Sequence, residues 1–68
     1  MAGGLANRLR DLRAEQGLTQ AGLAEKVGVS RKTINTVENG VFVPSALLAL
    51  KLARALGRPV EAIFRLED

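Results

Sequence analysis

The chain has 68 residues, of which 47% are apolar and 3% aromatic, and its formal net charge is +3. This length allows one domain with a marginal core, so association with a second copy would add stability. The sequence contains no Cys and no His, which excludes disulfides and removes the commonest metal ligands and general base. We therefore expect no metal site, no cofactor and no enzymatic activity. Without a long apolar run or a signal sequence, we expect no membrane span and a cytoplasmic location.

The charge is unevenly distributed along the sequence. Residues 1–58 contain nine Lys or Arg against four Asp or Glu, a net charge of +5. Residues 59–68 contain one Arg against three acidic residues, a net charge of −2. A basic segment of this kind indicates either a polyanionic partner or an ordinary solvated surface, and the charge count alone does not separate the two.

The N-terminal part of the chain predicts a first helix. Leu5, Leu9 and Leu12 recur at positions i, i+4 and i+7, which places them on one apolar helix face. Gly17 followed by Leu18 is typical of a left-handed helix end with its hydrophobic contact. We therefore expect these three leucines to lie in one helix that ends before Gly17.

Two further helices follow, separated by three residues. Thr19 is a good N-cap for a helix that ends at Gly28, and Ser30 caps the next helix, residues 31–38, which ends at Asn39. Gly28 has no Cβ and adopts a positive φ at little cost, so the chain can turn sharply there. A turn of this length sets two helices at a steep angle, about 90–120°.

The C-terminal part of the chain predicts two more helices. A fourth helix follows Ser45, and Pro59 sets the first turn of a short fifth helix, residues 60–64. Residues 64–68 can form a short extended tail, but no segment alternates long enough to predict a strand. We therefore expect an all-α fold, a compact five-helix bundle in a single domain over residues 1–68.

The stretch "TQAGLAEKVGVSRKTINTVENG", residues 19–40, resembles the helix-turn-helix of Cro/repressor-type (XRE) DNA-binding regulators. The matching positions are Gln20, Leu23, Ala24, Gly28, Val29, Ser30, Ile34, Glu38, Asn39 and Gly40. The resemblance continues through "PSALLALKLARALGRPVEAIF" and so covers nearly the whole chain. It implies a lambda-repressor-like fold with a helix-turn-helix at residues 19–39, in a short stand-alone transcriptional regulator that binds double-stranded DNA.

The third predicted helix, residues 31–38, supports DNA binding from its own side chains. At about 100° per residue, Ile34 and Val37 point inward. The opposite face carries side chains that can contact base edges in the major groove, namely Arg31, Lys32, Asn35 and Thr36. A merely solvated polar face is the alternative interpretation.

The resemblance implies further DNA contacts at the ends of these helices. Gln20 would reach a phosphate or a base edge from the start of its helix, although it could instead only cap or solvate that helix. Asn39 lies where family members contact phosphate, and it also ends its helix. The full predicted DNA-binding set is Gln20, Ser30, Arg31, Lys32, Thr33, Asn35, Thr36 and Asn39.

Glu38 is an acidic residue beside this basic surface. The resemblance suggests that it forms a structural ion pair with Arg13 of the first helix, which would fix the recognition helix while keeping its carboxylate away from phosphates. The alternative is a free surface glutamate that lowers nonspecific affinity for DNA.

We expect a repressor that binds a palindromic operator as a homodimer, without an evident small-molecule ligand. Residues 57–66 form the predicted dimerisation region, because they carry more apolar surface than one short helix can bury: Val60, Ile63, Phe64 and Leu66. The alternative function is an antitoxin or a coactivator-like protein-interaction module on the same fold. Its one hint is Leu47, which falls among Lys51 and Arg54 on a helix face expected to be wet, where either a shift in packing or a partner would cover it.

Overall fold

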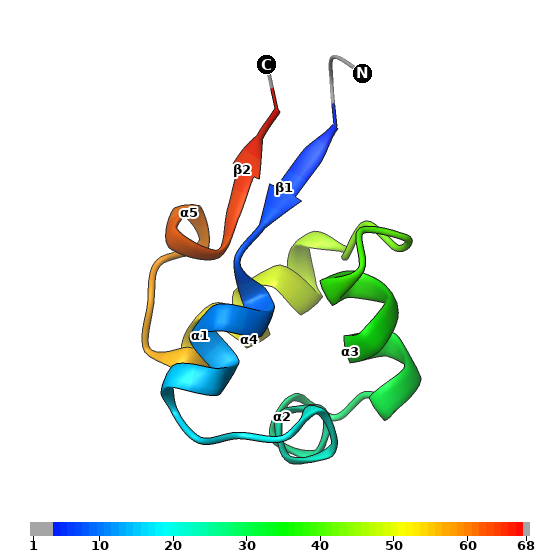
Figure 1. Ribbon diagram of the computed structural model, residues 1–68, viewed down its shortest axis with the longest axis vertical. Coiled ribbons are helices and arrows are strands. Elements are labelled where there is room, and N and C mark those ends of the chain that lie inside the picture. Colours follow the sequence, from blue (N-terminus) through cyan, green and yellow to red (C-terminus); the bar gives the residue numbers. More distant parts are fainter. Residues whose placement is uncertain (1–3, 68) are drawn as a thin grey trace.

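The computed structural model describes residues 4–67 as five short helices and a two-stranded sheet. In chain order the elements are β1 (Leu5–Asn7), α1 (Leu9–Glu15), α2 (Gln20–Val27), α3 (Arg31–Glu38), α4 (Ala46–Leu56), α5 (Val60–Ile63) and β2 (Phe64–Leu66). The two strands project together from one end of the helical body, and α2 lies at the other end (Figure 1). The five predicted helices are therefore confirmed, with a small sheet in addition.

The helix starts follow the capping residues expected from the sequence. The side chain of Thr19 accepts a hydrogen bond from the backbone of Gly22 at the start of α2. Ser30 accepts one from Thr33 at the start of α3, and Ser45 caps α4 in the same way. Each cap satisfies a backbone N–H that has no partner inside its own helix.

The sheet changes the assignment of Leu5, whose predicted place in the first helix is wrong. Leu5 lies in β1, where it pairs antiparallel with Leu66 of β2. The helix begins later because the Asn7 side chain accepts a hydrogen bond from the Leu9 backbone and donates one to the carbonyl of Val37. A short polar side chain that bonds the backbone in this way favours the start of a helix over its interior.

Phe64 likewise lies outside the fifth helix in which it was predicted. It follows α5 in an extended conformation, φ −119° and ψ 139°, and pairs with Asn7 as the first residue of β2. Residues 64–66 of the predicted extended tail thus form β2, which pairs with β1, and residue 68 lies outside the described residues.

The core lies between the helices and under the base of the sheet. Each helix contributes apolar side chains from one face, as the helical spacing predicts. The buried residues are Leu9, Leu12, Leu23, Ala24, Val27, Ile34, Val37, Leu48, Leu52, Leu56, Ile63 and Phe64. Over residues 4–67, no helix is both long and apolar enough to cross a bilayer.

Two leucines of α4 test this core directly. Leu52 is completely buried, whereas Leu50 is 61% exposed. We expect Leu52→Ala to lower the free energy of unfolding by about 2–5 kcal/mol, because it removes buried methyl groups and leaves a cavity. Leu50→Ala, the matched control, is expected to change it by less than about 0.5 kcal/mol. Urea unfolding followed by circular dichroism measures both, and equal losses would contradict this core.

Candidate nucleic-acid interface

The turn between α2 and α3 fixes how α3 is presented. Gly28 has φ +75°, a left-handed conformation that favours glycine, and its N–H donates to the carbonyl of Ala24 at 2.8 Å. Val29 donates to the same carbonyl at 3.0 Å. In Figure 1, α2 is seen nearly end-on while α3 runs across the view, so the two helices cross steeply. This arrangement is a helix-turn-helix.

The outer face of α3 carries polar and cationic side chains. Ile34 and Val37 are buried against the rest of the domain. Arg31, Lys32 and Asn35 are exposed on the outside. Within the described chain this face presents no carboxylate, because the one acidic residue of α3, Glu38, has a side chain with 0% exposure. The accessible surface of α3 therefore suits a polyanion.

The three hydroxyl residues of the predicted DNA-binding set also have structural roles. Ser30 and Thr33 share a hydrogen bond of 3.0 Å between their hydroxyl oxygens, next to the cap of α3. The Thr36 hydroxyl donates to the carbonyl of Thr33 at 3.0 Å. Ser30 is exposed, whereas Thr33 and Thr36 are half-buried, so the two threonines offer less surface than the cations beside them.

A chain of hydrogen bonds links α1 to the end of α3. Arg10 donates through Nη2 to the side-chain oxygen of Asn39 at 2.9 Å, and the Asn39 amide donates to Asn35. Asn35 therefore keeps its own amide N–H groups for an outside acceptor. The sequence analysis missed Arg10, although its spacing of three residues from Arg13 places both on one helix face.

Glu38 is the centre of a buried ionic network that joins three helices. Its Oε2 accepts a hydrogen bond from Nε of Arg13 at 2.6 Å, and its Oε1 accepts one from Nη2 at 3.2 Å, so the pair is bidentate. Gln20 at the start of α2 donates to Oε1 at 3.0 Å, and Nε of Arg10 lies 3.5 Å from the same atom. Arg13 also donates to the carbonyl of Leu18 at 2.8 Å. The predicted pair is therefore present, with two further partners.

These contacts decide the charge state of Glu38. Burial raises the pKa of its carboxyl, but hydrogen bonds from Arg13 and Gln20 and the Arg13 charge outweigh burial, and the pKa lies below its usual value. The hydrogen bond to Glu38 raises the pKa of Arg13, against the opposing effect of burial. Both groups therefore stay charged at neutral pH, and the carboxylate is compensated internally.

Gln20 is thus engaged inside the protein. Its side-chain amide donates to Glu38, and the residue is only half-exposed. One amide N–H and the amide oxygen are not used by this hydrogen bond. The structure accordingly places Gln20, the first residue of α2, beside the last residue of α3.

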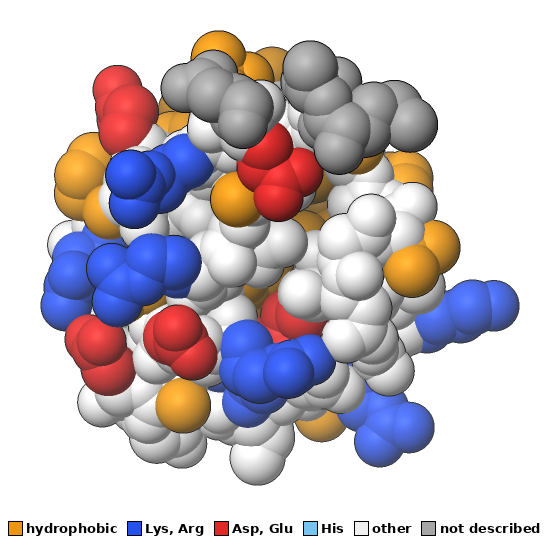
Figure 2. Space-filling model, turned by 45° about the horizontal axis from the view of Figure 1, so that its top comes forward, with side chains coloured by type: hydrophobic (Ala, Val, Ile, Leu, Met, Phe, Trp, Pro, Cys, Tyr) orange, Lys and Arg blue, Asp and Glu red, His pale blue; other side chains and the backbone are white. Residues whose placement is uncertain are grey.

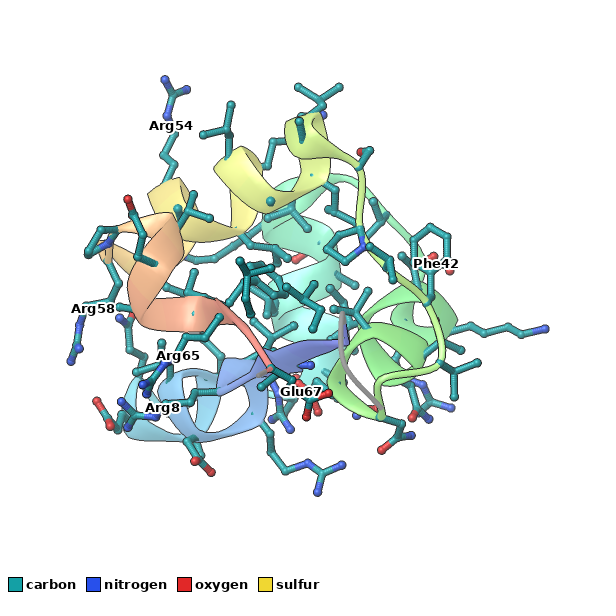
Figure 3. All side chains as sticks on the ribbon, turned by 90° about the horizontal axis from the view of Figure 1, so that it is seen from above. Arg8, Phe42, Arg54, Arg58, Arg65 and Glu67 are labelled. Carbon is teal, nitrogen blue, oxygen red and sulfur yellow. The ribbon has the colours of Figure 1, made fainter. Side chains whose placement is uncertain are left out.

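Positive charge is also present far from α3. Figure 2 shows Lys and Arg side chains spread around the face it views, interspersed with acidic ones. Arg8, Arg58 and Arg65 lie on the side of the molecule opposite Phe42 (Figure 3). Arg58 forms an ion pair with Glu15 at 3.0 Å. The sequence is basic over residues 1–58 and acidic over residues 59–68, but the folded molecule does not have one basic end and one acidic end.

Residues of the predicted dimerisation region separate into two groups. Ile63 is completely buried and Phe64 is 8% exposed within a single chain. Their apolar surface covers the domain's own core, so they offer almost none to a second copy. Val60 is half-buried, whereas Leu66 is 80% exposed on β2.

Comparison with known proteins agrees with this geometry. The chain matches the model of the helix-turn-helix family HTH_3 over residues 9–63. It is 44% identical over 64 residues to the HTH-type transcriptional regulator YgzD of Bacillus subtilis (strain 168), covering 94% of this chain and 97% of the relative. An HTH-type transcriptional regulator of Methanothermobacter thermautotrophicus is 52% identical over 61 residues, which is 88% of each chain.

Similar folds also occur among solved structures. The crystal structure of the restriction-modification controller protein C.AhdI from Aeromonas hydrophila superimposes with a TM-score of 0.77 and 40% sequence identity. The superposition covers 81% of this chain and 83% of the controller protein.

The depressed pKa of Glu38 predicts how stability depends on pH. The stabilising contribution of the ionised carboxyl is complete above its unfolded pKa, about 4.3, and is lost as the pH falls through the lower folded value. We expect Glu38→Gln to lower the free energy of unfolding by about 1–3 kcal/mol at pH 7. The difference from the unaltered protein should shrink below pH 4.

Urea unfolding between pH 3 and pH 7 measures this effect, with Glu25→Gln as the matched control. Glu25 is exposed and forms no ion pair in residues 4–67, so its variant is expected to follow the unaltered protein at every pH. A Glu38→Gln deficit that persists unchanged at pH 3 would contradict the role given to the charge.

Proposed function

This chain belongs to the HTH_3 family of helix-turn-helix, DNA-binding transcriptional regulators, and from that premise we propose that it is a repressor that binds a palindromic operator as a homodimer. The family is one of regulators and not of enzymes. Occupancy of an operator that overlaps a promoter excludes polymerase, so binding alone is sufficient for repression.

The observation that carries this proposal is the exposed face of α3. Arg31 and Lys32 lie in its first turn, with Asn35 one turn further on, and all three side chains are exposed. Arg and Lys donate to the O6 and N7 atoms of guanine, and Asn pairs with adenine. An eight-residue helix with these groups fits the major groove, so we assign base reading to Arg31 or Lys32 together with Asn35.

The residues around this face have a positioning role in the proposal. Gln20 lies at the start of α2 and Ser30 caps α3, where backbone N–H groups favour an anionic phosphate. Asn39 lies at the other end of α3, held by Arg10. Phosphate contacts at both ends fix the depth and register of the helix, whereas they carry little sequence information.

Homodimerisation follows from the small size of one recognition surface. A single α3 reads a few base pairs, and a two-fold pair would read half-sites about 10–10.5 bp apart or a multiple of that spacing. The C-terminal region remains our candidate interface, now reduced to Leu66 and the exposed part of Val60. Leu66 lies in β2, which pairs with β1 along one edge. A second copy that docks here covers both an exposed leucine and a strand edge that has no partner within residues 4–67.

Base reading and phosphate contacts predict different mutant behaviour. We expect Arg31→Ala or Lys32→Ala to weaken operator binding by about 1–3 kcal/mol and to relax the preference at one position of each half-site. Asn39→Ala is expected to weaken operator and random DNA by the same factor. Selection of bound sequences from random duplexes, followed by fluorescence anisotropy at fixed salt, measures both effects.

Arg8→Ala is the matched control, because it removes the same charge from an exposed position on the side of the molecule away from Phe42 and α3 (Figure 3). Its sequence preference should be unchanged. If Arg31→Ala and Lys32→Ala each weaken operator and random DNA equally, neither residue reads bases, and the protein is a nonspecific DNA binder.

Dimerisation is tested by two leucines with similar exposure on different elements. Leu66→Gln on β2 is expected to shift the sedimentation of the protein toward monomer and to weaken operator binding. Leu47→Gln on α4, where the leucine is 63% exposed, should leave the dimer intact. Unaltered protein that sediments as a monomer at micromolar concentration and still binds the operator with full affinity would refute the homodimer.

A further inference from the structure

The outward face of α4 is unusually apolar for a solvated helix surface. Leu47 and Leu50 are 63% and 61% exposed, and their spacing of three residues places them on the same helix face. Phe42, in the segment that joins α3 to α4, is 47% exposed. The neighbouring leucines Leu48 and Leu52 are buried, so the helix already has its core face, and this second apolar face has no partner within residues 4–67.

Two cavities lie along α4, and the first of them is lined by Phe42 and Leu47 of this face. The first, about 270 Å³, lies between Phe42 and Leu47 and has Val29 and Lys51 in its wall. The second, about 470 Å³, lies between the ends of α2 and α4. Lys51 lines both cavities, so they meet at this side chain. Lys51 thus stands between an apolar hollow and one that is lined by several charged side chains.

The charged side chains of the second cavity are mostly basic. Lys26, Lys51 and Arg54 line the second cavity together with a single acid, Glu25. The Arg54 side chain projects away from the body of the molecule (Figure 3). None of these three cations forms an ion pair with a carboxylate in the part of the chain that the structure describes. They are therefore available to an anionic group from outside.

These features favour one kind of partner. A second copy docked symmetrically on this face would add a second Lys51 and Arg54 to the interface, while α4 itself has no acidic residue to pair with them. DNA would satisfy the cations but would leave the exposed leucines against a hydrated phosphate backbone. An amphipathic protein segment with acidic flanks satisfies both parts, because its apolar side chains fill the first cavity while its carboxylates meet the cations.

We propose that Phe42, Leu47, Leu50, Lys51 and Arg54 form a docking surface for an acidic, amphipathic helical segment of another protein. This surface is formed mainly by α4 and adjoins the reading face of α3 at Phe42, which lines a small hollow with Lys32, Thr33 and Thr36. Thr33 also borders the first cavity. Arg31 and Asn35 line neither hollow, so NMR shift changes at these two residues distinguish operator binding from partner binding.

The test uses a designed helical peptide with Leu at positions i, i+3, i+4 and i+7 and Glu on both flanks. A control peptide has Lys in place of every Glu. When the acidic peptide is added to ¹⁵N-labelled full-length protein, we expect NMR shift changes that centre on residues 42–54 and leave Arg31 and Asn35 unaffected. Binding should weaken with salt, since the flanking contacts are ionic.

Variants of exposed residues separate the apolar contribution to peptide binding from the ionic one. Leu47→Gln is expected to weaken binding of the acidic peptide by about tenfold. The double change Lys51→Glu with Arg54→Glu should abolish it and transfer the preference to the Lys peptide. Glu61→Gln, an exposed change on α5, is the control and should alter neither affinity.

Four outcomes would overturn the proposal. These are no detectable binding of the acidic peptide at millimolar concentration, equal binding of the two peptides, shift changes centred outside residues 42–54, or retained preference for the acidic peptide after charge reversal. Dissociation of the homodimer by Leu47→Gln would assign this face to a second copy instead. Loss of operator affinity on Lys51→Ala with Arg54→Ala would assign it to DNA.

Discussion

The buried carboxylate of Glu38 is the constraint on which the arrangement of the three N-terminal helices depends. An ionised group with no exposed side-chain surface is tolerated only when charged and hydrogen-bonding partners replace water. Those partners come from α1, through Arg13, and from the start of α2, through Gln20. A shift of α3 would therefore leave a carboxylate and a guanidinium partly unpaired in a low-dielectric site. The same contacts draw the one acid of α3 away from its outer face, so a single interaction sets both the orientation and the charge of the surface proposed to meet DNA.

The features that the sequence predicted well are local ones. A serine or threonine cap acts on a backbone N–H three residues away, so Thr19, Ser30 and Ser45 reveal the helix starts without knowledge of the tertiary fold. The two strands were missed for the opposite reason. Each has three residues, and Leu5 meets Leu66 across almost the whole chain, so neither strand has a period long enough to be recognised by itself. Leu5 also fits a helical stripe with Leu9 and Leu12, and long-range contacts select the strand, namely the pairing with β2 and the hydrogen bond from Asn7 to Val37.

The candidate site shows the same division. The inward and outward sides of α3 follow from the positions of Ile34 and Val37, so its exposed cations were predictable. The link from Arg10 through Asn39 to Asn35 was not, because it joins residues 29 positions apart. The C-terminal segment illustrates a further limit. Its apolar residues predicted a surface that is buried by another contact. The sequence pattern does not say whether that contact is a second copy or the core of the same chain. For Ile63 and Phe64 it is the core of the same chain.

The distribution of the remaining apolar surface argues for more than one contact with other molecules. A chain of this size has little apolar surface to spare, yet six large hydrophobic side chains are left exposed among the described residues. Five of them lie between residues 41 and 50, and the sixth, Leu66, lies on β2. Exposed apolar groups gathered on one short segment are more informative than the same groups scattered singly. Within residues 4–67, the cations of α4 form no ion pair and β2 has a strand partner on one edge only, so the two surfaces suit chemically different occupants. A homodimer joined at β2 would leave the α4 face of each copy open, so a bound regulator could present two copies of that face to a partner protein.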